Sequence, residues 1–484
     1  MAGRFLLLFK PVSRFTPEVG APERKVGFNE KLFWTGLALV LYLIMTEVPL
    51  FGIATGGQGD PFLYLRIIFA SHRGTLMELG IGPIVTAGLI LQLLTGSGMV
   101  QCDMSNPDDR MLFTTASKIF SFILIGVQAS AYIIGGVYQL SDPRMAIVVF
   151  LQLVFAGLVL MLLDEMIQKG WGIGSGISLF ILAGVAQGIL WESLSVVPSL
   201  AGETESTRSY GAIPALIQAF MQGEFNPQFL YTRAQNLPTM LGFFTTIIVF
   251  LIVIYAEGVR VELPISYAGY RGFRSRYPIK LLYVSNLPVI FASALFANVY
   301  FISQILWSNL NRSNTNPWLN LLGMYKAPTT TGGSATPIGG LVYFVIPPRS
   351  IFDIVSDPMG PVRAVAYTGI LVAFSIVFSL TWLEVGGLGA STVAKQLVDS
   401  GMEIPGFRRS EKPIEQVLKR YIPTVTILGG AIVGLIAAVA DFFGVFGTGM
   451  GVLLSVGILY QYYQLLMQER VAEMYPALRR FFGG

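Results

Sequence analysis

A series of long apolar runs between residues 32 and 468 limits the folds that this 484-residue chain can adopt. A helix needs about 20 mostly apolar residues to cross ~30 Å of hydrocarbon. Ten runs come close to that length, and they lie at 32–53, 76–95, 112–138, 144–163, 173–196, 238–256, 281–304, 362–384, 421–440 and 450–468. The sequence therefore predicts an all-α polytopic membrane protein with ten transmembrane helices.

The scarcity of charge supports this prediction. Asp, Glu, Lys and Arg make up 12% of the residues, whereas soluble domains carry roughly 25%, so such a chain could not cover a soluble surface. The net charge of +4 does not by itself indicate a nucleic-acid partner. One cysteine (Cys102) and one histidine (His72) exclude disulfide frameworks and Cys- or His-rich metal sites. The sequence also lacks a P-loop motif, and we expect neither enzymatic activity nor a cofactor.

The distribution of basic residues predicts the orientation. With the N-terminus inside, most of the 32 Lys and Arg residues fall in inward segments, as the positive-inside rule requires. We therefore expect both termini in the cytoplasm. The flanking segments are then an N-terminal interfacial segment at 1–31, an external loop at 197–237 and a cytoplasmic tail at 469–484.

Two inward loops, 256–280 and 385–420, are longer and more basic than a simple connection needs. Two roles fit their positive charge: anchoring to anionic lipids, or docking a polyanionic partner such as ribosomal RNA through its phosphates. The length of the loops favours docking. The candidate docking residues are Arg260, Arg271, Arg274, Arg276, Lys280, Arg408, Arg409, Lys412, Lys419 and Arg420.

The apolar pattern is interrupted at two places. The segment from Phe62 to Arg73 is amphipathic but only about 12 residues long, which is too short to span a bilayer. Irregular backbone at membrane depth must be buried in protein or line a cavity. Glycines at 170, 172, 174 and 176 open the fifth run, where they either pack helices closely or break one.

Ionisable side chains are nearly absent from the middle of the runs. Glu47, Asp164, Glu165 and Glu384 all lie toward run ends. Transporters coupled to protons or ions keep such groups near the membrane midplane. The pattern disfavours a secondary transporter of a small solute, although it does not exclude one. A membrane-anchored scaffold that binds ribosomes is another alternative.

Several long motifs resemble those of the SecY family, the large subunit of the protein-conducting channel. They are 22–25 (PERK), 73–86 (RGTLMELGIGPIVT), 172–177 (GIGSGI), 277–280 (YPIK), 285–288 (SNLP), 419–423 (KRYIP) and 449–454 (GMGVLL). The resemblance covers essentially the whole chain with the order of spans preserved. The stretches 255–257 (YAE) and 406–412 (GFRRSEK) are similar to archaeal members.

The resemblance implies two inverted halves of five helices, 32–196 and 238–468, around an hourglass pore. It also implies a ring of aliphatic side chains at the waist: Ile81, Val85, Ile173, Ile177, Ile290 and Leu454. Such a ring excludes water and ions by dewetting. Ile81/Val85 and Ile173/Ile177 are each spaced i,i+4, which predicts that both members of a pair share one helical face.

The resemblance further implies a re-entrant plug at about 63–73 and a lateral gate between spans 2–3 and 7–8. The plug residues are Leu63, Leu65, Ile67, Ile68, Phe69, His72 and Arg73. The polar gate positions are Thr86, Gln128 and Asn298, and Gln128 replaces the Glu of some archaeal members.

The function that the resemblance implies is a passive channel in the plasma membrane. It translocates secretory polypeptides, releases hydrophobic segments sideways into the lipid, and is driven by a partner such as the translating ribosome. The implied partners are a SecE/gamma-type clamp subunit, a small peripheral beta-type subunit, the ribosome with its RNA, signal sequences, nascent chains and anionic lipids.

Overall fold

The computed structural model describes residues 11, 17–53, 70–96, 99–100, 102, 107–134, 138, 142–198, 208–223, 226–233, 237–267, 274–282, 287–326, 336–348, 350–399, 402–403 and 411–474. Within these ranges, nine helices are long and apolar enough to cross a membrane. The polytopic, mostly helical architecture expected from the apolar runs is confirmed.

The first half contains five main helices, with a π-helical turn, η2 (Ile167–Trp171), between the last two. They are α2 (Phe28–Glu47), α4 (Gly82–Gly96), α5 (Pro107–Ile134), α6 (Pro143–Met166) and α7 (Gly176–Leu194). The second half contains α10 (Met240–Gly258), α11 (Leu287–Leu310), α15 (Gly360–Val385), α17 (Glu411–Phe442) and α18 (Gly449–Met474).

The helix α4 is the shortest of these ten elements. It has 15 residues, about 22 Å at 1.5 Å per residue, whereas the apolar run predicted a span at 76–95. Residues 76–81 form turns instead, and Gly80 takes a φ of +53°, a left-handed conformation that cannot continue a right-handed helix. The second predicted span is therefore shorter than expected.

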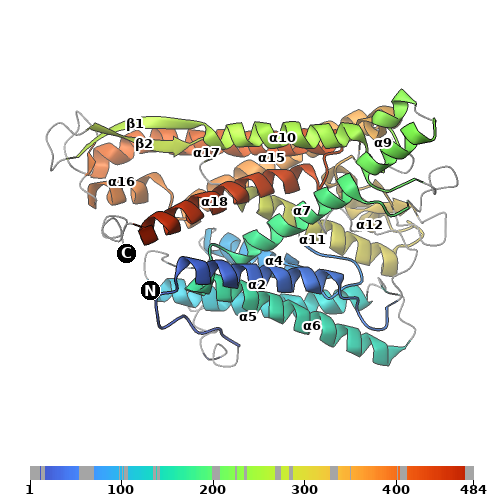
Figure 1. Ribbon diagram of the computed structural model, residues 1–484, viewed down its shortest axis with the longest axis horizontal. Coiled ribbons are helices and arrows are strands. Elements are labelled where there is room, and N and C mark those ends of the chain that lie inside the picture. Colours follow the sequence, from blue (N-terminus) through green and yellow to red (C-terminus); the bar gives the residue numbers. More distant parts are fainter. Residues whose placement is uncertain are drawn as a thin grey trace.

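The two halves face each other across the bundle (Figure 1). Helices α2, α5 and α6 lie on one side, α10, α15 and α17 on the other, and α4, α7, α11 and α18 lie between them. Across the interface α7 packs against α18, and α4 packs against α11 and α15. The pore-lining elements expected from the resemblance are thus the central ones.

Two strands occupy the first basic loop, although an all-α fold was expected. Strand β1 (Arg260–Tyr267) pairs antiparallel with β2 (Arg274–Lys280), with Arg260 opposite Lys280. A short third strand, β5 (Met402–Glu403), pairs with β1 from the second basic loop. Val261, Leu263 and Ile265 alternate with other residues at the two-residue period of a strand, a local signal that the apolar-run count does not detect.

The second basic loop also contains helix α16 (Ala390–Asp399), which packs on α17. Together with Ile279 of β2, these elements bury a small apolar core of their own. The β1–β2 hairpin and α16 lie at the end of the bundle where α2 begins and α18 ends (Figure 1). The two basic loops are therefore folded into one structured region.

Short elements occupy the opposite end of the bundle, where Figure 1 shows α9 and α12. These elements are α9 (Ala212–Met221), the 3-10 turn η3 (Pro227–Leu230), α12 (Pro317–Leu322), β3 (Met324–Lys326), β4 (Thr336–Gly339), α13 (Leu341–Val345) and α14 (Ile351–Ser356). Strands β3 and β4 form an antiparallel pair. Helix α9 falls inside the predicted external loop 197–237.

Large apolar side chains are exposed along the outer helices. Phe33 is 63% exposed, Phe155 66%, Leu251 61% and Val365 75%, and they belong to four different predicted spans. A soluble monomer rarely exposes contiguous apolar surface on this scale. Lipid is the environment that covers such side chains, which agrees with a multi-pass membrane protein.

Candidate functional site: an aliphatic constriction and its seam

The first part of the predicted ring lies where α4 begins. Ile81 is fully buried and Val85 is 6% exposed. The Val85 N–H donates to the Ile81 carbonyl at 3.0 Å, so Ile81 accepts the i,i+4 hydrogen bond of the first helical turn. The i,i+4 spacing therefore does place these two residues one turn apart.

The second part of the ring lies where α7 begins, and there the helical-face prediction is wrong. The helix starts at Gly176, so Ile177 is in its first turn while Ile173 lies before it. Gly174 between them has a φ of +76°, which interrupts the helix. Ile173 is 4% exposed and reaches its position through an irregular segment and not through helical periodicity.

The ring residues from both halves meet in one apolar cluster. Ile81, Val85, Ile290 and Leu454 belong to this cluster, and the half-buried Ile177 packs against it. Ile81 directly precedes α4, and the others lie on α4, α7, α11 and α18, the four central helices. The structure thus brings together five of the six predicted residues, with Ile173 buried beside the α7 start.

Two of the three predicted gate residues are in direct contact. The Asn298 side-chain amide on α11 donates to the Thr86 hydroxyl oxygen on α4 at 3.1 Å and to the Ala294 carbonyl of its own helix at 2.7 Å. Gln128 is half-buried on α5 and takes no part in that hydrogen bond. Instead, Tyr132 on α5 stacks on Phe301 of α11 with ring centroids 4.9 Å apart, so an aromatic pair joins these two helices.

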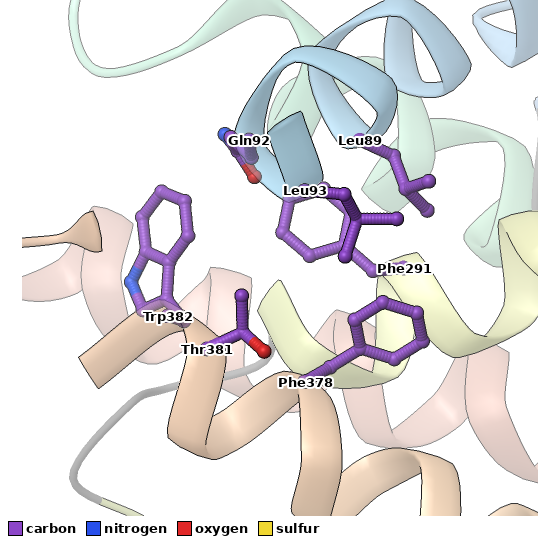
Figure 2. Close-up of a pocket in the computed structure, with 7 residues that line it drawn as sticks. All are labelled: Leu89, Gln92, Leu93, Phe291, Phe378, Thr381 and Trp382. Carbon is purple, nitrogen blue, oxygen red and sulfur yellow. The ribbon is translucent and has the colours of Figure 1, made fainter. Parts of the chain in front are cut away.

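We call the contact of α4 with α11 and α15 the seam between the two halves. A crevice lies in this seam. Figure 2 shows its lining residues, which are Leu89, Gln92, Leu93, Phe291, Phe378, Thr381 and Trp382. Phe291 lies 6.2 Å from Phe378 and 5.9 Å from Trp382 between ring centroids. The crevice is largely apolar. The sequence did not lead us to predict it, although one signal was present: Phe378 and Trp382 are spaced i,i+4 on α15 and therefore share a face.

The described end of the predicted plug is anchored to the first half. Leu63, Leu65, Ile67, Ile68 and Phe69 lie outside the described residues. The Tyr42 hydroxyl donates to the Ala70 carbonyl at 3.1 Å, and the Leu50 N–H donates to the Gly74 carbonyl at 2.7 Å. His72 and Arg73 lie in the irregular segment between these two contacts.

A buried carboxylate also holds this segment. Glu78 is fully buried and accepts a hydrogen bond from the Gly74 N–H. The sequence reasoning did not single out Glu78, because a carboxylate near the start of an apolar run resembles an ordinary span end. Its partner is a backbone amide, and no residue pattern records that pairing.

The basic residues are placed at the hairpin and at the start of α17. Arg260 is exposed at the first position of β1, and Arg276 pairs with Glu262 at 2.6 Å across the hairpin. This hydrogen bond lowers the pKa of the Glu262 carboxyl, which keeps the pair charged. Lys280 lies over the Tyr460 ring at 5.0 Å.

On α17, Lys412 and Arg420 are exposed, and Lys419 pairs with Glu415 at 2.8 Å. Arg271, Arg408 and Arg409 lie outside the described residues, and of Arg274 the backbone in β2 is described. Seven of the ten predicted docking residues therefore lie on elements of the folded basic region.

A charged network that the sequence reasoning missed joins the N-terminal segment to the first half. Glu18 pairs with Lys169 at 2.5 Å, and Lys169 pairs with Glu165 at 2.8 Å. Lys118 of α5 also pairs with Glu165. The hydrogen bond from Lys169 lowers the pKa of Glu18, as do the charges of both lysines. The network fixes the residues before α2 against α5 and η2.

The two halves of five helices meet in one buried apolar cluster, an arrangement that helical membrane channels have. A family model described as SecY matches residues 75–463, and a model described as the plug domain of Sec61p matches residues 40–74. The chain belongs to the SecY family.

Similar proteins and structures agree with this assignment. The protein translocase subunit SecY of Pyrococcus horikoshii is 43% identical over 483 residues, which cover 98% of each chain. A solved protein-conducting channel superposes with a TM-score of 0.80 at 38% identity, covering 97% of this chain and 99% of that one. Sec61 in the canine ribosome-channel complex from the endoplasmic reticulum superposes with a TM-score of 0.77 at 36% identity, covering 97% and 99%.

Proposed function

We propose that this chain is the pore-forming subunit of a protein-translocation channel. It passes secretory polypeptides across the membrane and releases hydrophobic segments sideways into the lipid. The observation that carries the proposal is the apolar cluster in which Ile81, Val85, Ile290 and Leu454, with Ile177 against them, join the two halves.

The chemistry of the ring fits a passive conduit for polypeptides. Aliphatic side chains at a narrow constriction exclude water, and ions that would have to shed their hydration shells cannot enter. The same side chains offer no hydrogen bonds, so an extended chain of any sequence slides past without being held. A signal sequence or nascent chain therefore meets a seal that widens around it and closes behind it.

The seam between α4 and α11/α15 fits a lateral exit. Its crevice is lined by apolar and aromatic side chains of both halves (Figure 2), which suit an apolar helix moving toward lipid. The Thr86–Asn298 hydrogen bond crosses this seam. Interhelical hydrogen bonds in membranes contribute about 0.6 kcal/mol on average, so this contact biases the closed seam without locking it.

The partners of the proposed channel follow from the folded basic region and from the relatives. The hairpin and the start of α17 present exposed Arg260, Arg276, Lys412 and Arg420, a charge pattern suited to ribosomal RNA or anionic lipids. Ribosome complexes occur among the similar structures. We propose that this region faces the cytoplasm with both termini, that the protein resides in the plasma membrane, and that SecE/gamma-type and beta-type subunits accompany it.

In this function the chain is a conduit and not an enzyme, because the driving force comes from the partner. We propose that the plug expected at about 63–73, most of which lies outside the described residues, closes the constriction in the resting state. The secondary-transporter alternative gains nothing from the comparisons, whose relatives are protein translocases and protein-conducting channels. A ring of aliphatic side chains also provides no binding site for a small polar solute.

The test replaces ring residues with a polar side chain. In channels reconstituted with their small subunits, Ile290→Asn and Ile81→Asn should wet the constriction and raise the resting ion conductance in planar bilayers by about tenfold or more. The matched control is Leu153→Asn, which buries the same amide in the α5–α6 contact away from the ring. Equal conductance in ring variants, control and unmodified channel would remove the ring from the proposal.

A further inference from the structure

The two pore helices at the contact between the halves, α7 and α18, begin in the same way. Residues 173–177 read IGSGI and residues 446–450 read FGTGM. Each helix starts at the second glycine of its segment, Gly176 or Gly449. The first glycine is left-handed in both segments, with a φ of +76° at Gly174 and +70° at Gly447.

A buried threonine from another helix holds each segment at the same position. Three residues before the α7 start, the Ile173 N–H donates to the Thr35 hydroxyl of α2 at 2.9 Å. Three residues before the α18 start, the Phe446 N–H donates to the Thr246 hydroxyl of α10 at 3.0 Å. Each hydroxyl also donates a hydrogen bond of 2.7 Å to a carbonyl of its own helix, that of Lys31 for Thr35 and that of Gly242 for Thr246.

A buried aspartate at the end of the preceding long helix holds each helix start. Asp164 near the end of α6 accepts from the Ile177 N–H at 2.9 Å. Asp441 near the end of α17 accepts from the Gly449 N–H at 2.6 Å. The second carboxylate oxygen is satisfied in both cases, by the Gln168 amide at 2.8 Å and by the Tyr367 hydroxyl at 2.9 Å.

These contacts follow the order of the helices in each half. The threonine is on the first helix, α2 or α10, the aspartate is on the fourth, α6 or α17, and the held segment leads into the fifth. The two first helices run in opposite directions, since α2 begins at the end of the bundle where α10 leads into β1 (Figure 1). The two sets of contacts therefore lie toward opposite ends of the bundle, as an inverted pair.

The left-handed glycines rest against the far part of the opposite pore helix. A Cβ at Gly174 would lie 3.0 Å from the Tyr462 ring of α18, and one at Gly447 would lie 3.1 Å from the Ile189 side chain of α7. The Tyr462 hydroxyl also donates to the Ser175 carbonyl at 2.7 Å. Each irregular start is therefore held by its own half and covered by the other half.

We propose that Thr35 with Asp164, and Thr246 with Asp441, are two clamps that position the ring residues at the starts of α7 and α18. The clamps are defined as these two threonine–aspartate pairs, and the proposal rests on the proposed function of the ring. Each clamp ties an irregular, pore-facing segment to outer helices of the same half, so that Ile173, Ile177 and Leu454 keep their places when the α4–α11 seam parts.

The ring requires that these two segments keep fixed positions. Ile173 and Phe446 are outside the helices, and their N–H groups have no intrahelical acceptor at those positions. Buried N–H groups must be satisfied, and a hydroxyl whose O–H is fixed by its own bond to a helix carbonyl has both acceptor lone pairs held in fixed directions. The threonine thus determines where the segment lies, whereas a water molecule could satisfy the amide in many positions.

The first experiment compares Thr35→Val and Thr246→Val, which keep the shape of the side chain and remove the acceptor, with Thr35→Ser and Thr246→Ser, which retain it. Channels are purified with their small subunits and placed in planar bilayers. We expect the valine variants to raise resting conductance by about tenfold, the effect of about one lost buried hydrogen bond on a closed–open equilibrium. The serine variants should restore the seal.

The matched controls are Thr46→Val on α2 and Thr426→Val on α17. Thr46 is 2% exposed and donates to Leu43 of its own helix at 2.6 Å, and Thr426 is 1% exposed and donates to Ile422 at 2.8 Å. Both remove a buried hydroxyl that bonds within one helix. A merely structural role of the clamps predicts the same loss of thermal stability and the same conductance in clamp and control variants.

The second experiment measures the segments directly. Hydrogen exchange of peptides covering 173–177 and 446–450 should accelerate about tenfold in the valine variants, each at its own end of the bundle, and not in the serine variants. Asp164→Asn and Asp441→Asn keep one carbonyl oxygen and should preserve most of the protection, whereas Asp164→Ala and Asp441→Ala should lose it.

The outcomes separate this proposal from the function on which it rests. If Ile290→Asn leaks while the valine variants neither leak nor lose protection, the ring stands and the clamps are overturned. If the valine variants lose protection from exchange but the ring variants do not leak, the ring does not seal the channel. The clamps then have no role in a seal either, and both proposals are overturned. A leak in the valine variants with rescue by serine supports both.

Discussion

At the residue scale, Thr86 and Asn298 place a polar contact in a largely apolar seam. Their 3.1 Å hydrogen bond joins α4 to α11, while Asn298 keeps a second bond to Ala294 within its own helix. Because the second bond lies within α11, parting of α4 from α11 does not itself break it, and the amide keeps a partner. The contact is therefore suited to reversible opening, and its loss should shift the gate without unfolding the protein.

Asn298→Ala should make the gate easier to open. Loss of about 0.6 kcal/mol corresponds to about a threefold shift in the closed–open equilibrium, so transport of a precursor with a weakened signal sequence should rise by about that factor. The measurement is precursor uptake into proteoliposomes. The control is Asn309→Ala, which removes an amide bonded to Ile305 of its own helix at 3.0 Å; an equal response in both variants would contradict the role of Asn298 in the seam.

Residues also show where sequence reasoning succeeds and where it stops. Most ring and gate positions lie in motifs that resemble a known family, whereas Ile290, Gln128 and Asn298 were identified by their place in the corresponding spans. Five of the six ring residues then meet in one cluster. The clamp residues escaped notice, because a lone Thr or Asp in or beside an apolar run has many roles. Thr35 and Thr246 each accept from a backbone amide more than 100 residues away in the sequence. Only folding brings each threonine to its partner.

At the element scale, local structure departed from the pattern of apolar runs in two places. The run at 76–95 predicted a full span, but Gly80 stops the helix and α4 keeps 15 residues. The loop at 256–280 predicted no regular structure, but strand periodicity in a basic, polar context folds it into β1 and β2. Window-averaged hydropathy reports apolar length, and it does not report backbone angles or cross-strand pairing.

The start of α17 and the hairpin form the element-scale basis for ribosome docking. Replacing Lys412 and Arg420 together by Glu should weaken ribosome binding most at low salt, because phosphate contacts release counterions. The measurement is a salt titration of binding to proteoliposomes. Arg312→Glu is the matched control, since Arg312 is exposed in the turn after α11 at the opposite end of the bundle. Salt-independent weakening, or equal weakening in the control, would instead favour a lipid-anchoring role.

At the scale of the whole molecule, the two halves meet through two kinds of contact. The α7–α18 contact is held by the Tyr462–Ser175 hydrogen bond and by glycines that permit close approach. The α4–α11/α15 contact consists of the Thr86–Asn298 pair and an apolar crevice. The first contact has a hydrogen bond at each end, because the Gly447 N–H also donates to Glu192 of α7 at 3.2 Å. The second contact has one such bond, which predicts that the halves part at the α4 side.

This prediction is tested by linking the seam. Thr86→Cys with Asn298→Cys, in a Cys102→Ser background that removes the single native cysteine, can be joined by a short bismaleimide. The link should abolish release of hydrophobic segments into lipid and reduce translocation of secretory chains by about tenfold or more. Each single-cysteine variant treated with the reagent is the control. Full activity of the linked channel would show that the halves separate elsewhere.

The clamps also have a consequence for the order in which the protein can be assembled during synthesis. Thr35 and Asp164 both precede Ile173 and Ile177 in the chain, so the first half can complete its clamp as soon as α7 emerges. The second clamp waits for Gly449, and the Tyr462–Ser175 bond that joins the two pore helices waits for the last helix. A nascent copy of this protein therefore has one finished half, and an open side, until α18 has been made.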